Sequence, residues 1–244
     1  MSQVEGRNPV YETMKRGGVK RLLVLEGLLD ERIDDILAQA KRLKVPVERV
    51  TRERLDKMSK TKHHQGVIAL VDAPGYVSLE SVLKKTGKDV CVLVLDGVQD
   101  PQNLGSVLRT GDATKVDVVL IPRRDSAGLT PTVFRVSMGG AANVPVSKES
   151  IYPAVKLLKA EGIRLIAIDT SGKHDYWDMD LTGAVAFVLG GEGEGISPTL
   201  LEKCDMVLRI PMKGQVPNLN VGVSAAVVLY ERLRQMNVKL STSS

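Results

Sequence analysis

The sequence predicts an α/β protein with a mostly parallel sheet, because strand-like apolar runs alternate with helical patterns along most of the chain. The clearest runs, residues 90–95 and 184–189, are continuous and partly β-branched, as in parallel strands that are buried on both faces. Alternation of this kind places helices on both faces of the sheet. The predicted strands of this part are 90–95, 117–121, 163–168, 184–189 and 206–210, and its helices are about 102–114, 151–161 and 221–236.

Two domains are predicted, because a segment typical of a connection interrupts the pattern after residue 72. Residues 1–72 form a small α/β unit, with strands at 21–26, 45–50 and 67–71 and an amphipathic helix at 30–43. The run Ala73-Pro74-Gly75-Tyr76 contains the residues that favour turns. We therefore assign 73–86 to a linker and 87–240 to the second domain, and expect a disordered tail at 241–244.

Three polar segments follow predicted strands of the second domain. They are residues 96–110 after the first strand, the glycine-rich run 190–195 (GGEGEG), and residues 211–220 (PMKGQVPNLN) before the last helix. Loops at the carboxyl ends of parallel strands bind ligands, and glycines there allow a ligand to approach the backbone. The glycine spacing matches neither the dinucleotide fingerprint nor the P-loop, so a pyrophosphate held in the usual way is excluded.

In this order, three motifs resemble the SpoU (TrmH) family of RNA ribose 2′-O-methyltransferases, which belongs to the SPOUT superfamily. The motifs are N-x-G-x-x-x-R at 103–109, G-x-E-G-x-G at 190–195, and IPM-x-G with LNV at 210–221, and the resemblance covers about 89–231. Residues 6–10 (GRNPV) and 64–67 (HQGV) also resemble the substrate-binding domain of the RlmB-type members, the 23S rRNA guanosine-2′-O-methyltransferases.

This resemblance implies a fold, a cofactor and a set of site residues. The fold is a C-terminal trefoil-knot methyltransferase domain, with a small N-terminal α/β RNA-binding domain that resembles ribosomal proteins. The cofactor is S-adenosyl-L-methionine, and the expected cofactor-binding residues are Gly190, Gly191, Ile210, Met212, Asn218 and Leu219. The expected catalytic residues are Arg109, Asn103, Glu192 and Asn220.

Arg109 matches the catalytic arginine of the family, although a guanidinium with a pKa above ~12 is a poor base. We expect it to hold an RNA phosphate and to stabilise the developing 2′-alkoxide. Asn103 is expected to orient Arg109 or the ribose, and Glu192 to hold Arg109 or a loop amide. Asn220 is expected to cap the last helix and to shape the cofactor loop. The structural alternatives are a surface arginine for Arg109, an amide in the first helical turn for Asn103 and a solvated loop acid for Glu192.

The third motif departs from the family pattern at two positions. The family often has Ser-Leu-Asn-Val-Ser there, whereas this chain has Asn218 and Gly222 in place of the two serines. Asparagine can still donate and accept hydrogen bonds, so the motif is kept while the role of position 218 is left open.

The charge distribution predicts an RNA partner. Residues 41–62 hold nine Lys and Arg against three Asp and Glu. The net charge of this segment, 9 − 3 = +6, exceeds the +5 net charge of the whole chain. A concentrated basic segment is typical of a phosphate-binding surface, although a solvated helix face is the usual alternative. The segment contains no aromatic residue, so it is expected to contact phosphates and RNA shape and not to stack on bases.

Several other classes of protein are not expected. The sequence has no long apolar run and no basic leader with an apolar core, so we expect a cytoplasmic protein without a membrane span. Cys91 and Cys204 are expected to be buried thiols and not a disulfide. The three histidines lack metal-ligand spacing, so no metal is expected.

The last helix predicts a homodimer. Val223, Val227 and Tyr230 make an apolar stripe beside a run of small residues at 222–226, although in a monomer this stripe would face its own sheet. The family's dimeric habit favours the dimer. The sequence is thus interpreted as an RNA ribose 2′-O-methyltransferase that acts on a guanosine of large-subunit rRNA. The alternatives are a tRNA ribose methyltransferase and a non-catalytic RNA-binding or ribosome-assembly protein on the same scaffold.

Overall fold

The chain divides into two compact units, Met1–Gly75 and Tyr76–Ser244. The computed structural model describes residues 2–16, 18–59, 62–71 and 75–242. Residues 76–86, which the sequence analysis placed in the linker, belong to the second unit because helix α4 (Leu79–Leu83) packs into its core. Of the expected tail, 241–242 end the last helix, and 243–244 lie outside the described residues.

The first unit is a four-stranded sheet with helices on both faces. Its elements are β1 (Ser2–Glu5), α1 (Arg7–Arg16), β2 (Val19–Leu25), α2 (Glu31–Arg42), β3 (Val47–Val50), α3 (Arg52–Met58) and β4 (Val67–Val71). The strand order is β1-β4-β2-β3, in which β3 is parallel to β2 and β4 is antiparallel to both of its neighbours. Helices α1 and α2 cover one face, and α3 covers the other.

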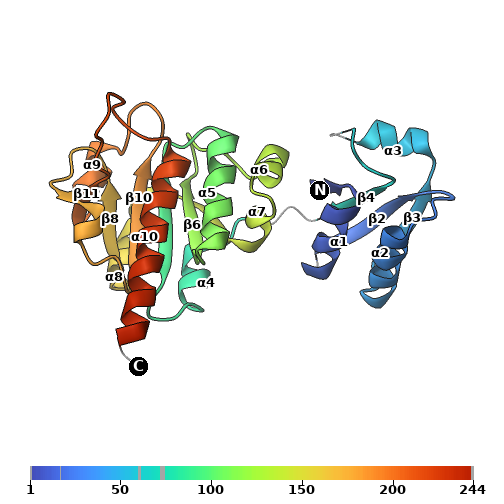
Figure 1. Cartoon of the computed structure of the whole chain (residues 1–244), viewed down its shortest axis with the longest axis horizontal. Helices are drawn as coiled ribbons and strands as arrows, with labels where there is room; N and C mark the ends of the chain where they lie inside the picture. The colour runs from blue at the N-terminus through green and yellow to red at the C-terminus, as the bar shows by residue number, and fades with distance from the viewer. Residues whose placement is uncertain (1, 17, 60–61, 72–74, 243–244) are drawn as a thin grey trace. The chain divides into compact units, whose positions relative to one another are not determined.

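The second unit is built on a seven-stranded sheet (Figure 1). After α4 its elements are β5 (Cys91–Asp96), α5 (Pro101–Ala113), β6 (Val118–Pro122), α6 (Pro131–Val136), α7 (Gly140–Asn143), β7 (Val146–Glu149), α8 (Ile151–Ala160), β8 (Arg164–Ile168), β9 (His174–Asp175), η1 (Tyr176–Asp178), β10 (Val185–Gly190), α9 (Pro198–Leu201), β11 (Met206–Arg209) and α10 (Val221–Thr242). The order is β7-β6-β5-β10-β8-β11-β9, and every pairing is parallel. This confirms the predicted α/β architecture. The trefoil knot, which strand order does not test, stays a prediction.

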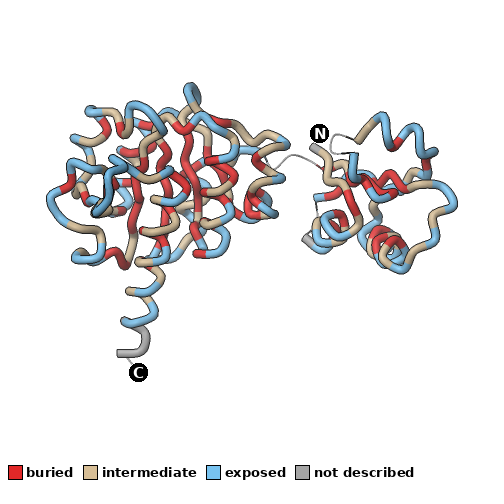
Figure 2. The backbone as a smooth tube through the Cα atoms, turned by 45° about the horizontal axis from the view of Figure 1, so that its top comes forward, coloured by how far each residue is buried: buried red, intermediate tan, exposed pale blue. Residues whose placement is uncertain are grey.

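Two apolar cores lie on the two faces of this sheet, because successive side chains of a strand point in opposite directions. In β5, Leu93 faces the core under α5 and α10, and Val92 and Val94 face the core under α4, α8 and α9. Both faces of the central strands are therefore buried (Figure 2), which explains why their sequences are apolar without interruption.

The parallel pairing brings the carboxyl ends of four strands to one edge of the sheet. In register, Gly190 pairs with Asp96, and Leu189 and Leu208 both pair with Ile168. The segment after β5 enters helix α5 as the sequence predicts. The Asp100 side chain accepts a hydrogen bond from the Gln102 N–H (2.8 Å), and Pro101 occupies the first turn.

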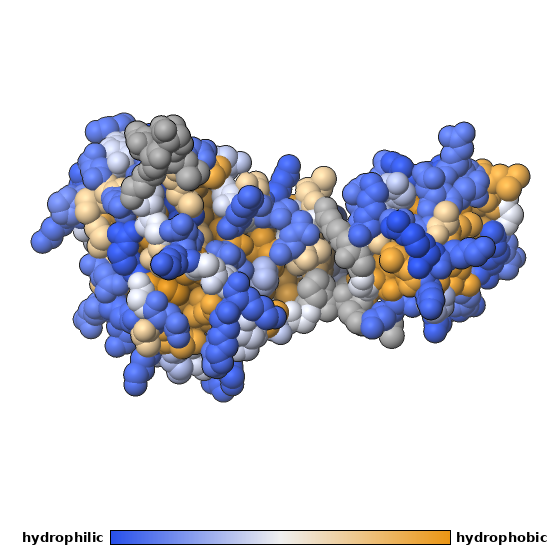
Figure 3. All heavy atoms as spheres, turned by 90° about the horizontal axis from the view of Figure 1, so that it is seen from below, coloured by the Kyte–Doolittle hydropathy of each residue, from blue (hydrophilic) through white to orange (hydrophobic). Residues whose placement is uncertain are grey.

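The surface is mainly hydrophilic on the face drawn in Figure 3, where apolar residues show in smaller patches between hydrophilic ones. Within the described part of the chain, no helix is both long enough and apolar enough to cross a membrane. Cys91 is buried and Cys204 is half-buried, and both are free thiols. Burial raises the pKa of Cys91 to about 12 and that of Cys204 to about 11, so both are protonated at neutral pH.

Two glycines of the 190–195 loop make a matched test of this packing. A Cβ atom on Gly191 would lie 2.1 Å from the carbonyl oxygen of Gly97, whereas one on Gly193 would meet nothing within 4 Å. We expect Gly191→Ala to lower the free energy of unfolding by about 1–3 kcal/mol. Gly193→Ala should change it by less than about 1 kcal/mol. Urea denaturation of the full chain measures both values, and equal losses would contradict the close approach of Gly191 and Gly97.

Candidate active site

A cavity of about 690 Å³ lies at the carboxyl edge of the sheet in the second unit. The loops after β8, β10 and β11 and the first turn of α10 line it. The lining residues are Ile168, Asp169, Thr170, Leu189, Gly190, Gly191, Glu192, Gly193, Glu194, Gly195, Ile196, Ile210, Met212, Asn218, Leu219, Asn220, Val221 and Ser224. This set includes all six residues that the sequence analysis expected to bind the cofactor.

The glycine-rich wall of the cavity is a narrow turn. Gly191 and Gly195 form an isolated antiparallel bridge, and a Cβ atom on Gly190 would lie 2.1 Å from the carbonyl carbon of Gly195. The far end of the turn is anchored to β5, because the Ser197 N–H donates to Asp96 Oδ2 (2.9 Å). The wall therefore presents backbone groups to the cavity with almost no side chain in the way.

Three polar residues from distant parts of the chain meet beside this wall. Asn103 Nδ2 donates to Glu192 Oε1 (2.7 Å), and Asn220 Nδ2 lies 2.7 Å from the same oxygen and 2.9 Å from Asn103 Oδ1. We call this group the amide–carboxylate triangle. Asn220 Oδ1 also accepts hydrogen bonds from the backbone N–H groups of Gly222 and Val223, so Asn220 both caps α10 and joins the triangle.

Arg109 lies apart from the triangle. Its side chain is exposed and has no hydrogen-bond or ion-pair partner among the described residues. Six residues along a helix correspond to a rotation of about 600°, so Asn103 and Arg109 lie on different faces of α5. Glu192 holds the side-chain amides of Asn103 and Asn220, and neither Asn103 nor Glu192 forms a described hydrogen bond or ion pair with Arg109.

The glycine at position 222 has a local structural reason. A Cβ atom there would lie 2.8 Å from Ser106 Oγ on α5, so a serine at position 222 would displace that side chain. Gly222 thus permits α10 to pack closely against α5. Asn218, the other departure from the family pattern, is exposed and lines the cavity without a hydrogen bond to another described residue.

Sequence reasoning missed Asp169 at the end of β8. Its Oδ1 accepts hydrogen bonds from the backbone N–H (2.9 Å) and hydroxyl (2.7 Å) of Ser171, while Oδ2 has no partner among the described residues and lies near Gly195 at the cavity. Its signal in the sequence was a polar residue directly after a predicted strand, the same signal that identified the other loops.

The electrostatics of the cavity favour a cationic ligand that carries apolar groups. Its lining residues contribute three carboxylates, Asp169, Glu192 and Glu194, and no Lys, Arg or His. Ile196, Ile210, Met212 and Leu219 supply apolar wall, and the glycine turn supplies backbone donors and acceptors. Among the described residues, those of the cavity included, no group of three or more His, Cys, Asp or Glu residues has the arrangement of a metal site.

Two family models match the chain. The model of the SpoU rRNA Methylase family matches residues 90–230, which is more than half of the chain, and the model for RNA 2′-O ribose methyltransferase substrate binding matches residues 3–77. The chain belongs to the SpoU methylase family. It is an RNA 2′-O-methyltransferase of that family, and its cofactor is S-adenosyl-L-methionine.

Curated relatives of this SpoU-family chain match nearly its whole length. A protein of Staphylococcus epidermidis named "Putative TrmH family tRNA/rRNA methyltransferase" is 37% identical over 237 residues, or 95% of each chain. A protein of Neisseria meningitidis serogroup B named "23S rRNA (guanosine-2′-O-)-methyltransferase RlmB" is 39% identical over 223 residues, or 91% of this chain and 89% of the relative.

Solved structures agree with this assignment. A crystal structure of an RNA 2′-O ribose methyltransferase is 31% identical, with a TM-score of 0.76, and the match covers 96% of this chain and 88% of that one. The SpoU methyltransferase AviRb of Streptomyces viridochromogenes has a TM-score of 0.81 at 24% identity, covering 96% of this chain and 88% of that one, and at this identity it supports the fold alone.

The cavity fits S-adenosyl-L-methionine on physical grounds. Its carboxylates complement a sulfonium cation, its apolar wall suits an adenine ring, and its bare glycine turn leaves backbone groups free to bind a nucleoside. Gly190, Gly191, Ile210, Met212, Asn218 and Leu219 would hold the cofactor, and the volume of about 690 Å³ is within the range of small-molecule sites.

A double-mutant cycle tests the amide–carboxylate triangle. Asn103→Ala and Glu192→Ala each remove a hydrogen bond that the other residue shares, so their effects on stability should not add. We expect a coupling energy of at least about 0.5 kcal/mol in urea denaturation. As a control, Asn103→Ala combined with Lys156→Ala on α8, which faces the other side of the sheet, should be additive. A coupling near zero for Asn103 and Glu192 would contradict the contact.

Proposed function

We propose that this chain methylates the ribose 2′-hydroxyl of a guanosine in large-subunit ribosomal RNA. The observation that carries the proposal is the 39% identity to the RlmB protein of Neisseria meningitidis, because it extends over 91% of the chain and so includes the substrate-binding unit. The glycine-walled cavity beside the amide–carboxylate triangle supports methyl transfer at this site.

In the proposed mechanism the bound cofactor supplies an electrophilic methyl group, and the protein supplies orientation and electrostatics. Glu192 draws the side chains of Asn103 and Asn220 together, and this fixes the glycine turn, the start of α10 and helix α5 relative to one another. A fixed frame of this kind lowers the barrier by holding the reacting groups in an attack geometry.

Arg109 is the cation proposed to meet the RNA. Its exposed guanidinium, which pairs with no described residue, can bind a phosphate of the substrate and stabilise the negative charge that develops on the 2′-oxygen. Glu192 Oε2, which has no partner among the described residues, is an acceptor available to the ribose hydroxyl or to Arg109 on RNA binding. Asn103 and Asn220 are proposed as positioning residues for Glu192.

The basic segment 41–62 is proposed to attract the RNA backbone. In the first unit it covers the end of α2, strand β3 and helix α3, and most of its side chains are exposed, although Lys60 lies outside the described residues. Glu48 pairs with Arg54 (2.8 Å) and Arg21 (3.5 Å), so the acids of the segment neutralise only part of its charge. The remaining cations suit a polyanion.

A homodimer through α10 is also proposed. In the isolated chain Val223 and Tyr230 are 48% and 53% exposed, while Ala225, Val228 and Leu229 on the other face of the helix are buried in the core. The apolar stripe therefore does not face its own sheet. Its partner in this proposal is the same stripe of a second copy of the chain.

Mapping of ribose methylation tests the activity and its target. Purified chain, S-adenosyl-L-methionine and transcripts of large-subunit rRNA and tRNA should give a 2′-O-methyl group on one rRNA guanosine. Arg109→Ala should lower the rate about 10²–10³-fold, because one group at a developing charge is lost. It should leave cofactor affinity unchanged, since Arg109 does not line the cavity.

Lys156→Ala is the matched control for this experiment, because it removes an exposed cation on the opposite face of the sheet. It should retain the wild-type rate. Methylation of tRNA alone would favour the tRNA alternative, and cofactor binding without methylation of either RNA would favour a non-catalytic protein. Near-wild-type turnover by Arg109→Ala would show that Arg109 is a surface arginine without a catalytic role.

Sedimentation equilibrium at micromolar concentration tests the dimer. The wild-type chain should have about twice its 26.5 kDa mass. Val223→Glu combined with Tyr230→Glu should give the monomer mass, because it places like charges opposite each other in a symmetric interface. Val216→Glu, at another exposed apolar residue, serves as the control and should leave the mass unchanged. A wild-type mass of one chain would reject the proposal.

A further inference from the structure

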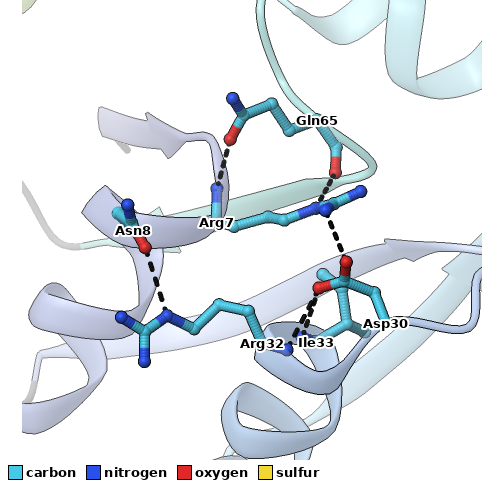
Figure 4. A network of polar contacts seen from close by, with 6 residues as sticks. All are labelled: Arg7, Asn8, Asp30, Arg32, Ile33 and Gln65. Atoms are coloured by element: carbon cyan, nitrogen blue, oxygen red, sulfur yellow. Dashed lines mark hydrogen bonds and ion pairs between the residues drawn. The ribbon is translucent and has the colours of Figure 1, made fainter.

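A second cavity, of about 560 Å³, lies within the first unit and takes no part in the site described above (Figure 4). Arg7 and Asn8 at the start of α1, Asp30, Glu31 and Arg32 at the start of α2, and Gln65 before β4 line it. We call it the Arg7 pocket. Three of its six lining residues, Arg7, Asn8 and Gln65, belong to the two N-terminal motifs, GRNPV and HQGV, whose individual roles the proposed function leaves open.

Arg7 is held rigidly at the centre of the pocket. Its Nη1 pairs with Asp30 Oδ2 (2.5 Å), its Nε donates to the carbonyl oxygen of Gln65 (3.1 Å), and its backbone N–H donates to Gln65 Oε1 (3.1 Å). Asp30 Oδ1 in turn accepts hydrogen bonds from the first turn of α2, so both carboxylate oxygens of Asp30 are engaged. The guanidinium is thus fixed before any ligand binds.

The turn that presents Gln65 is also fixed. Gln65 and Gly66 have φ angles of +49° and +85°, in the left-handed region that is costly for a residue with a side chain. Buried His64 holds this turn, because its Nδ1 accepts from the Gly66 N–H (3.0 Å) and its Nε2 therefore donates to Asp56 Oδ1 (2.8 Å). The strained position of Gln65 is maintained by the surrounding structure, as at many binding sites.

Arg32 supplies a second fixed cation. Its Nε donates to Asn8 Oδ1 (3.1 Å), and its guanidinium carbon lies 4.1 Å from the centre of the Tyr11 ring, a cation–π contact. Asp35 is 3.6 Å from its Nη1. Arg32 Nε is thus bonded to Asn8, and one face of the Arg32 guanidinium lies on the Tyr11 ring. Arg32 Nη2 has no partner among the described residues.

The groups of the pocket that lack a described partner are mostly donors. These donors are Arg7 Nη2, Asn8 Nδ2, Arg32 Nη2 and Gln65 Nε2. Among the side chains that line the pocket, the exposed carboxylate of Glu31 is the one acceptor group without a described partner. Fixed guanidinium and amide donors bind phosphate oxygens, and a lone carboxylate accepts from the N–H of a base or from a ribose hydroxyl. A nucleotide carries both kinds of group, whereas a free phosphate carries one.

An exposed leucine adjoins the pocket. Leu29 directly precedes Asp30 and is 92% exposed, the highest value among the large apolar side chains of the described residues. A hydrophobic residue directly before the N-cap of a helix often packs against a hydrophobic fourth helical residue. Here the N-cap is Asp30 and the fourth helical residue is Asp34, so Leu29 has no such partner. Leu29 therefore offers free apolar surface to the face of a base.

We propose that the Arg7 pocket holds one unpaired nucleotide of the RNA substrate. The phosphate lies on the donors of Arg7, Asn8, Arg32 and Gln65, and the base lies against Leu29. The inference rests on the proposed function, because it takes RNA as the substrate. It gives the first unit a site that requires a single-stranded nucleotide, in addition to a basic segment that attracts RNA of either form.

Fluorescence anisotropy of the full chain tests the pocket with two labelled probes: an RNA hairpin with an unpaired loop, and a blunt RNA duplex of the stem sequence. Leu29→Ser should weaken hairpin binding about fivefold or more, since apolar surface buried against a base is lost, and leave duplex binding unchanged. Arg32→Gln should also reduce the salt slope for the hairpin by about 0.7, the value for one phosphate contact on single-stranded RNA.

The controls are an exposed apolar residue and an exposed arginine of the same unit. Ala38→Ser, on α2 outside both the basic segment and the pocket, should bind both probes as the wild type does. Arg52→Gln, in the basic segment, should weaken both probes alike. Unchanged hairpin affinity in Leu29→Ser and Arg32→Gln, or equal losses on hairpin and duplex, would overturn the pocket proposal while methylation and cofactor binding stand. Failure of the wild-type chain to bind either RNA would overturn the proposed function as well.

Discussion

The close approach of backbone segments at the carboxyl edge of the parallel sheet is the constraint on which the site in the second unit depends. Gly190 and Gly191 have no room for a Cβ atom, because the backbone of Gly195 lies against the first and that of Gly97 against the second. Only with these contacts can the turn after β10 lie beside the loop after β5. The cavity and the amide–carboxylate triangle both follow from that proximity.

The triangle converts this backbone packing into a fixed arrangement of three loops. Asn103 and Asn220 are separated by 117 positions in the sequence, and Glu192 accepts hydrogen bonds from both. Because Asn220 also caps α10, the packing of that helix against α5 and the shape of the cavity wall are linked. Loss of any one member would remove two of the three hydrogen bonds, so the three act as a unit.

The charges of the molecule are divided in a way that suits two unlike ligands. The cofactor cavity is lined by carboxylates and by no Lys, Arg or His, whereas the cations proposed to contact RNA lie on α5, in the basic segment and in the Arg7 pocket. This division would favour a sulfonium cofactor at one surface and a polyanionic RNA at the others. In the first unit the basic segment offers mostly exposed side chains, whereas Arg7 and Arg32 are held by hydrogen bonds and, for Arg32, by an aromatic ring.

The sequence by itself determined the α/β class, the strands around the cavity and the long helices. These follow from local patterns, namely uninterrupted apolar runs and helical periodicity. The six expected cofactor residues, which line the cavity, were implied by the resemblance of three ordered motifs to a known family. Short elements such as β1, α6, α7 and β9 were not predicted, because a few residues carry too little periodicity. Tertiary structure alone decided the strand order, the separation of Arg109 from Glu192, the place of Asp169 and the Arg7 pocket. Each of these depends on contacts between segments far apart in the chain, and such contacts are set by how the sheet and its helices pack and not by any local pattern.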